Sequence, residues 1–519
     1  MTMIAGTALL TLSPVPAIGA TEPPSPTAAT TTAAAPTSTG APTTPTAART
    51  PTTAAGPTAT DAESDAEQAI DARYLSLGGP TGVLGPPTSA LIPLTGGYLK
   101  TYARGRIYYS VATGAHDLRA GPILDKYLRL GAEKSLLGYP NGSEYAGGQA
   151  GVLVQHFHHG RIYWSSTTGA WELTGVFLTY YVGLGGAAGP LGLPTSTTYS
   201  AGVARAQNFT AGRVYFHVAT GAQGVYGPTL ARYLQLGGPQ GILRLPTKAE
   251  YAGRRAGVRV TNFQGGRVWY SPRSGAREVL GATLAKYLAI GAEASWIGVP
   301  TSYHRATSYG DWQGFQHASI QYFKSKRKAY VRLGWSKTVR KAWRSDVRYS
   351  YRSGCPLGPS QLRVVRMPFR NWALDDQYGT VIVRARVVND IAAVFKSAHA
   401  RTWAIRRVQP VDAYKGSDPA SMRADNTSAF NCRKVTGNPY RLSRHSYGDA
   451  IDINPFENPY VTARKVYPEG SRTYLNRKNY RKGMLRRGDA VESVMRRLGW
   501  PWGARWRYPD YQHFSENGA

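Results

Sequence analysis

The hydrophobic positions of this chain recur with a long period between residues 74 and 323. Four units contain alternating β-branched and aromatic residues that end in Thr-Gly or Ser-Gly, such as GRIYYSVATGA at 105–115, which predicts strand, tight turn and strand. One unit is too small to bury its apolar face, so we expect the units to stack into a β-rich tandem-repeat domain. The fifth unit loses the pattern after Phe315, as expected of a capping repeat. The units open with YLSLGG, YLRLGA, YVGLGG, YLQLGG and YLAIGA at Tyr74, Tyr127, Tyr181, Tyr233 and Tyr287.

The last third of the chain mixes two periodicities. The segment TVIVRARVV at 380–388 predicts a strand, and residues 389–400 follow it with the apolar spacing of a helix. A second helix is predicted at 488–501, where Asp489 is placed to cap the first turn and Glu492 to close a capping box. Strands and helices without a regular alternation predict an α+β domain with an antiparallel sheet and flanking helices.

Composition divides the chain into five parts. Residues 1–20 are similar to the back half of a secretory signal peptide, and 21–66 are a Thr/Ala/Pro-rich stalk that cannot bury a core. The repeats occupy 67–323, a basic linker that begins with KSKRK is predicted at 324–344, and the α+β domain fills 345–519. No apolar run reaches about eighteen residues, so we expect no transmembrane segment.

The net charge of +32 is large, because 62 Lys and Arg stand against 30 Asp and Glu. Of these cations, 39 lie from Lys324 onward, so the basic character belongs mainly to the C-terminal part. Such a charge predicts a polyanionic partner. That partner is nucleic acid, an anionic membrane or an anionic cell-wall polymer. Because the chain has a signal-like start and no recognised nucleic-acid motif, we expect no nucleic acid.

Only two cysteines occur, Cys355 and Cys432. In an oxidising compartment they are expected to form a disulfide that closes a long loop. The alternative is two buried free thiols. A zinc finger requires more cysteines at closer spacing.

The candidate chemistry lies in two short segments near the end of the chain. RHSYGDAIDI contains His445 and Asp452, and DYQHFS contains Asp510 and His513. Two histidines and one carboxylate leave coordination positions open, as a hydrolytic metal requires. Asp510 is left over and is suited to act as general base. Non-haem iron oxygenases use the same ligand types, but nothing in the sequence predicts their barrel.

The two segments resemble the exported zinc D-alanyl-D-alanine carboxypeptidase and L-alanyl-D-glutamate endopeptidase family, whose pattern is S-x-H-x-x-G-x-A-x-D followed by D/E-x-x-H. The resemblance covers about 345–519 and implies one Zn²⁺ per chain, bound by His445, Asp452 and His513. It also implies that Asp510 is the base and that peptidoglycan stem peptides are the substrates. The matching positions are Ser443, His445, Gly448, Ala450, Asp452, Asp510 and His513.

The repeats resemble LGFP repeats, which implies attachment to the cell wall. The Phe of that name is replaced here by Pro, Tyr, Leu or Val, which leaves the ligand of the repeats open.

In the C-terminal domain, the resemblance to the carboxypeptidase and endopeptidase family also implies an upstream arginine that binds substrate. Arg433 and Arg423 are the candidates, with Ser443 as a further substrate-binding residue. Arg433 is favoured because a disulfide at Cys432 would fix its backbone.

The sequence therefore predicts a secreted, cell-wall-bound, monomeric zinc peptidase of the D-alanyl-D-alanine carboxypeptidase type. Its expected architecture is a repeat domain followed by an α+β peptidase domain. The alternatives are an L-alanyl-D-glutamate type endopeptidase and a wall-binding protein whose peptidase domain is inactive.

Overall fold

The structure, a computed structural model, describes residues 59–435 and 438–518. The predicted signal peptide at 1–20 and most of the predicted stalk lie outside these residues. The end of the stalk prediction is wrong, because helix α1 (Ala59–Ser76) begins within it. Residues 59–66 contain Ala, Thr and Ser like the stalk, but they have three acidic residues and no proline. Ala66, Ile70 and Tyr74 are spaced four apart and form one buried stripe.

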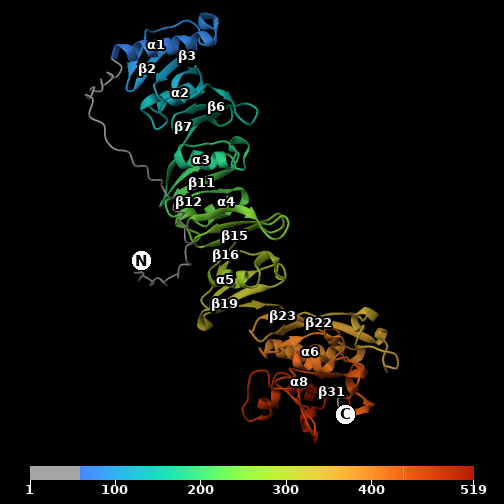
Figure 1. Cartoon of the computed structure of the whole chain (residues 1–519). Helices are drawn as coiled ribbons and strands as arrows, with labels where there is room; N and C mark the ends of the chain where they lie inside the picture. The colour runs from blue at the N-terminus through green and yellow to red at the C-terminus, as the bar shows by residue number, and fades with distance from the viewer. Residues whose placement is uncertain (1–58, 436–437, 519) are drawn as a thin grey trace, which may run out of the picture. The chain divides into compact units, whose positions relative to one another are not determined.

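The repeat region consists of helices that alternate with four-stranded antiparallel sheets (Figure 1). The four predicted hairpins are present as β3–β4, β7–β8, β11–β12 and β15–β16. The helices are α1, α2 (Pro122–Arg129), α3 (Gly175–Gly183), α4 (Gly227–Gln235) and α5 (Gly281–Ala289). The first two sheets comprise β1 (Ile92–Leu94), β2 (Gly97–Tyr102), β3 (Gly105–Ser110), β4 (Gly114–Arg119), β5 (Tyr145–Ala146), β6 (Val152–Phe157), β7 (Gly160–Ser165) and β8 (Gly169–Thr174). The next three comprise β9 (Tyr199–Ala201), β10 (Ala204–Asn208), β11 (Gly212–His217), β12 (Gly221–Tyr226), β13 (Pro246–Ala252), β14 (Arg259–Phe263), β15 (Gly266–Ser271), β16 (Gly275–Leu280), β17 (Arg305–Ala306), β18 (Asp311–Gly314), β19 (Ser319–Phe323) and β20 (Lys328–Arg332).

The tyrosine that opens each unit has the same role in all five. Its ring is buried, and its hydroxyl donates a hydrogen bond to a backbone carbonyl eleven residues further on. This bond satisfies the buried phenol and fixes the turn after the helix. The acceptors are Gly85, Gly138, Gly192, Arg244 and Gly298, at 2.6 to 2.9 Å.

The predicted linker at 324–344 is wrong in its first half. The fifth unit has a complete sheet, because β20 pairs with β19 and buries Ala329 and Val331. The run KSKRK forms the turn between these two strands, where its charges remain in water. Basic residues in a hairpin turn and in a linker look alike in sequence, since both are solvated.

The C-terminal domain contains the antiparallel sheet β21-β22-β23, and α6 packs on one face of it (Figure 1). The predicted strand at 380–388 ends earlier, because 385–387 form a 3₁₀ turn that leads into α6. The second predicted helix is shorter than 488–501, although Asp489 accepts hydrogen bonds from the backbone N–H groups of Val491 and Glu492. The elements are β21 (Thr338–Lys341), β22 (Leu362–Arg370), β23 (Asp376–Arg384), α6 (Val388–Ala400), β24 (Arg407–Val408), α7 (Asp418–Arg423), β25 (Asn426–Thr427), β26 (Lys434–Val435), β27 (Asn438–Leu442), β28 (Ala450–Asp452), β29 (Tyr460–Val461), β30 (Val466–Tyr467), α8 (Glu492–Arg497) and β31 (His513–Ser515).

Cys355 and Cys432 form a disulfide, with their Cα atoms 6.0 Å apart. The backbone N–H of Cys432 also donates to the carbonyl of Ser350 at 2.8 Å. The bridge therefore ties the segment before β22 to the residue that precedes Arg433. Among the described helices, none combines the length and apolar character needed to cross a bilayer.

Candidate metal centre

Two of the three predicted ligands come from paired strands. β28 and β31 are antiparallel neighbours, and their register places Asp452 directly opposite His513. Ile451 and Phe514 point to the other face and are fully buried in the core. Because side chains alternate along a strand, packing of this apolar pair directs the carboxylate and the imidazole to one shared side.

The third predicted ligand lies on the 3₁₀ turn Arg444–Tyr447, which leads into β28. The Ser443 hydroxyl caps this turn by accepting the backbone N–H of His445, and Gly448 ends it with a left-handed φ of 66°. A Cβ on Gly448 would lie 2.8 Å from the backbone nitrogen of Arg384, so only glycine fits. The Nδ1 atom of His445 donates to the carbonyl of Ala429, which leaves Nε2 as the free ligand atom.

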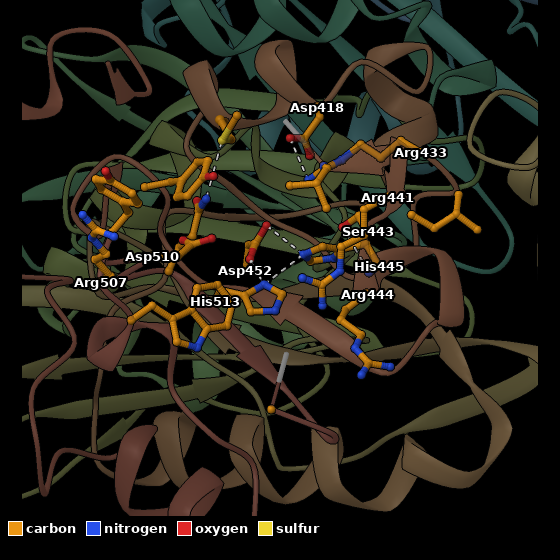
Figure 2. A pocket seen from close by; sticks show the side chains of 18 residues that line it. Asp418, Arg433, Arg441, Ser443, Arg444, His445, Asp452, Arg507, Asp510 and His513 are labelled. Carbon is orange, nitrogen blue, oxygen red and sulfur yellow. Dashed lines mark hydrogen bonds and ion pairs between the residues drawn. The ribbon is translucent and has the colours of Figure 1, made fainter. Parts of the chain in front are cut away.

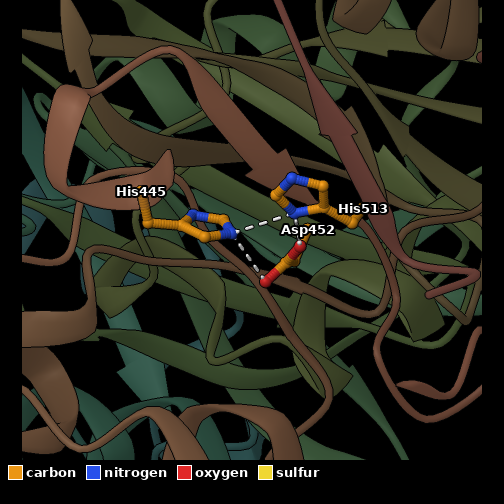
Figure 3. A group of neighbouring side chains, drawn as sticks. All are labelled: His445, Asp452 and His513. Atoms are coloured by element: carbon orange, nitrogen blue, oxygen red, sulfur yellow. Dashed lines mark hydrogen bonds and ion pairs between the residues drawn. The ribbon is translucent and has the colours of Figure 1, made fainter. Parts of the chain in front are cut away.

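Figure 3 shows His445, Asp452 and His513 converging on one point. Nε2 of His445 lies 3.0 Å from Asp452 Oδ2 and 3.2 Å from His513 Nδ1, and Asp452 Oδ1 lies 3.0 Å from the same His513 atom. A tetrahedral zinc ion with ligand distances of about 2.0 Å separates its ligand atoms by roughly 3.3 Å. The donor types and their spacing therefore fit a zinc ion.

The electrostatics of the three residues also fit a cation. Burial opposes the charge of Asp452, but the two imidazoles beside it hold its pKa well below the usual range. Burial likewise disfavours charged His445, yet the carboxylate of Asp452 raises the pKa of His445 above its ordinary value. A carboxylate that keeps its charge between two imidazoles attracts a divalent ion in competition with protons.

Asp510 lies three residues before His513 and lines the same cavity. Its backbone N–H donates to the carbonyl of Gly503 at 3.0 Å, which holds the loop in front of β31. The side chain is buried, and within the described part of the chain its Oδ1 atom has no hydrogen-bond partner. Burial, followed by the nearby charge of Asp452, raises the pKa of Asp510 to about 7. A carboxyl group with this pKa accepts and releases protons near neutral pH.

The comparisons with known families agree with this geometry. Residues 436–516 match the family model described as D-alanyl-D-alanine carboxypeptidase, and this segment contains all three candidate ligands and Asp510. The C-terminal domain, which contains this matched segment, is called the carboxypeptidase-family domain. The LGFP repeat model matches four units, at 84–135, 137–189, 191–241 and 243–295. Both predicted resemblances are confirmed, and together they support a peptidoglycan-related peptidase that carries repeats.

No curated protein matches the chain. Among solved structures, the extracellular domain of a one-component system from B. thetaiotaomicron is 10% identical over 57% of this chain and 35% of its own, with a TM-score of 0.11. Hsv2 from Kluyveromyces lactis is 7% identical over 56% of this chain and 70% of its own, with a TM-score of 0.10. The chain thus spans about a third of the length of the first of these. Similarity at these TM-scores is no basis for a shared fold.

The carboxypeptidase-family domain has a cavity of about 470 Å³ above the three candidate ligands (Figure 2). Arg433 and Ser443, the predicted substrate-binding residues, line it, and the guanidinium of Arg433 forms an ion pair with Asp418 at 2.8 Å. Arg423 is exposed at the end of α7 and is not among the lining residues, so the structure does not support it as a substrate contact.

Several lining residues escaped the sequence prediction. Arg441, Arg507, Tyr460 and Asp418 all face this cavity. Arg441 and Arg507 were hidden among many exposed basic residues, and no local pattern marks Tyr460 or Asp418. These residues lie around one cavity only in the folded chain, where the 418–444 segment, the β29 hairpin and the C-terminal loop meet.

Elsewhere in the C-terminal domain, a buried acidic pair shares one arginine. Asp425 and Glu457 contact the guanidinium of Arg406 at 2.6 and 2.8 Å, and Glu457 is fully buried. Burial, with a further contribution from Asp425, raises the pKa of Glu457 from 4.5 to about 8. The folded domain therefore holds a proton at this site that the unfolded chain has already released at neutral pH.

This proton predicts a pH dependence of stability. Between pH 4.5 and about 8 the folded state binds more protons at Glu457 than the unfolded state, so the free energy of unfolding should fall as the pH rises, by up to about 4 kcal/mol. Glu457→Gln mimics the protonated side chain and should remove this decline. Urea unfolding at pH 5 and pH 8 checks it. An equal change in wild type and variant would contradict the assignment.

Proposed function

We propose that the chain is an exported, wall-anchored zinc peptidase that hydrolyses D-amino-acid-containing stem peptides of peptidoglycan, acting as a D-alanyl-D-alanine carboxypeptidase. The observation that carries this proposal is the convergence of His445, Asp452 and His513 beside Asp510 in one cavity. The family match over 436–516 supports the same class of reaction.

In this proposal, His445, Asp452 and His513 hold the ion. A zinc ion supplies a Lewis acid that polarises a peptide carbonyl and makes water acidic enough to lose a proton near neutral pH. Asp510 takes the proton from the attacking water and delivers it to the leaving amine, so the same carboxyl group returns to its starting state.

Arginines in the wall of the cavity are suited to bind the substrate. Arg433 is well placed to bind the terminal carboxylate, and Asp418 orients its guanidinium through their ion pair. Arg441 and Arg507 line the same cavity and add positive charge. A site with several arginines favours anionic peptides, and stem peptides that carry free carboxylates have this charge.

Anchoring is proposed to involve both parts of the chain. Residues 59–323 carry 22 Lys and Arg against 14 Asp and Glu, whereas residues 324–519 carry 39 against 15. Long-range attraction to anionic wall polymer therefore comes mainly from the C-terminal part, and it weakens as salt screens exposed charges. The repeats, with a more balanced charge, are proposed to hold the wall through specific contacts.

The test is digestion of purified peptidoglycan by the zinc-loaded full chain, followed by mass analysis of the products. Release of free D-alanine is the expected result. New N-terminal D-glutamate or D-isoglutamine would instead support the endopeptidase alternative. A zinc-loaded chain that binds peptidoglycan and yields no product would identify a wall-binding protein with an inactive domain.

A further inference from the structure

Three of the five repeat units share an ionic link at one equivalent position. The residue before the opening tyrosine of a unit reaches the fourth strand of the following sheet. There it meets the residue that pairs with the third residue of the neighbouring strand. The carboxylates involved are buried or nearly so. The pairs are Arg73–Asp117 at 2.7 Å, Lys126–Glu172 at 2.8 Å and Arg232–Glu278 at 2.7 Å.

The third unit preserves this link without charge. Its equivalent residues are Tyr180 and Gly224, and the backbone N–H of Gly224 donates to the Tyr180 hydroxyl at 2.7 Å. Both partners differ together from those of the other units. The contact is therefore a structural requirement of the unit, whether it is ionic or neutral.

The fifth unit retains the cation and lacks the acid. Lys286 occupies the position before the opening tyrosine, but the strand residue opposite Ile320 is Val331. The Lys286 side chain is 18% exposed. An ammonium group with so little solvent needs an anionic partner, because burying an unpaired charge is costly.

A residue of the carboxypeptidase-family domain provides that partner. Asp375, in the turn between β22 and β23, forms an ion pair with Lys286 through Oδ2. Its Oδ1 atom accepts the backbone N–H of Val331, the residue that replaces the missing acid, at 2.8 Å. The carboxylate of Asp375 thus takes the place of the acid that the fifth unit lacks.

Further bonds hold the same turn against β20. Asp376 accepts the backbone N–H of Leu333 at 3.0 Å, and the guanidinium of Arg332 donates to the carbonyl of Leu374 at 2.8 Å. Asp376 is itself fixed by Arg370 at 2.7 Å. The turn therefore presents two oriented carboxylates to the end of the fifth unit.

In two other units the acid also contacts the unit that follows. The Ser143 hydroxyl donates to Asp117 at 2.7 Å, and the backbone N–H of His304 donates to Glu278 at 2.9 Å. The acid position thus joins consecutive units. At the end of the array, the domain that follows is the one that carries Asp375.

We propose that the fifth unit is a docking adaptor committed to the carboxypeptidase-family domain, which takes the place of a sixth repeat and completes the fifth through Asp375. The edge of the fifth unit formed by β20 is then closed to wall polymer. The fourth match to the repeat model ends at residue 295, so α5 lies within it and the sheet β17–β20 of the fifth unit lies outside it.

Hydrogen exchange on the full chain tests this adaptor. Lys286→Met and Asp375→Asn should each accelerate exchange of the amides at 328–334 by about tenfold, and the double variant should be no faster than either single variant. Lys286→Arg retains the cation and should keep the wild-type protection. Lys126→Met, which breaks the equivalent link in the second unit, should leave 328–334 unchanged.

The opposite results would overturn the proposal. Additive effects of the two substitutions would show that Lys286 and Asp375 act independently. Unchanged exchange at 328–334 in both single variants would show that the contact does not hold the fifth unit. If Lys286→Met fails to fold, the Lys286→Arg and Asp375→Asn variants still test the proposal. Only Asp375→Asn should lose protection of the amides at 328–334 from exchange.

Discussion

Replacing Asp510 by asparagine is expected to lower the turnover of stem peptides by at least about a thousandfold while the ion stays bound. The amide has the shape of the carboxyl group but cannot take a proton from the attacking water. The buried Oδ1 atom of Asp510 has no partner among the described residues, so no neighbour is left unpaired by the change. The measurement is kcat for release of D-alanine, together with the zinc content of the purified variant.

The matched control is Asp449→Asn. Asp449 is also buried and lies three residues before a candidate ligand, but it pairs with Arg386 and does not line the cavity. This variant should lose stability and keep its turnover. Near-normal turnover of zinc-loaded Asp510→Asn would remove Asp510 from the proposed chemistry.

Replacing Asp452 by asparagine should weaken zinc binding by more than about a hundredfold and abolish hydrolysis. Substitution of residues that merely support a ligand already weakens binding by about ten- to a hundredfold, and Asp452 is the only anionic member of the proposed set. Its carboxylate faces both imidazoles at 3.0 Å, so the neutral amide removes the charge on which both contacts depend. Titration with a competing zinc indicator measures the affinity.

Arg423→Ala is the control for the Asp452 variant. Arg423 is exposed and outside the cavity, so zinc affinity and turnover should both remain unchanged. Wild-type zinc affinity in Asp452→Asn would mean that the ion, if bound, sits elsewhere.

The sequence predicted the repeats and the grouping of the candidate ligands because each leaves a local pattern. The tyrosine of each unit recurs at nearly constant spacing, and the His445–Asp452 segment combines ligand types with strand alternation. Which of the other candidate residues reach the cavity depends on their positions in the folded chain. Arg433 and Arg423 are ten residues apart and chemically equal, yet only Arg433 reaches the cavity.

Errors arose where one composition serves two structures. KSKRK is equally suited to a linker and to a hairpin turn, and the pairing of β20 with β19 decides for the turn. Asp375 gave no signal, because two adjacent aspartates between strands are common in turns. Its role depends on Lys286, which lies 89 residues away in the sequence.

The most direct test of the proposed function is the release of D-alanine from purified peptidoglycan by the full chain, measured before chelation, after chelation and after zinc is returned. We expect release that stops when the metal is removed and recovers with one equivalent of zinc. Release that continues in the fully chelated protein, or a protein that binds one zinc and releases no D-alanine, would contradict it.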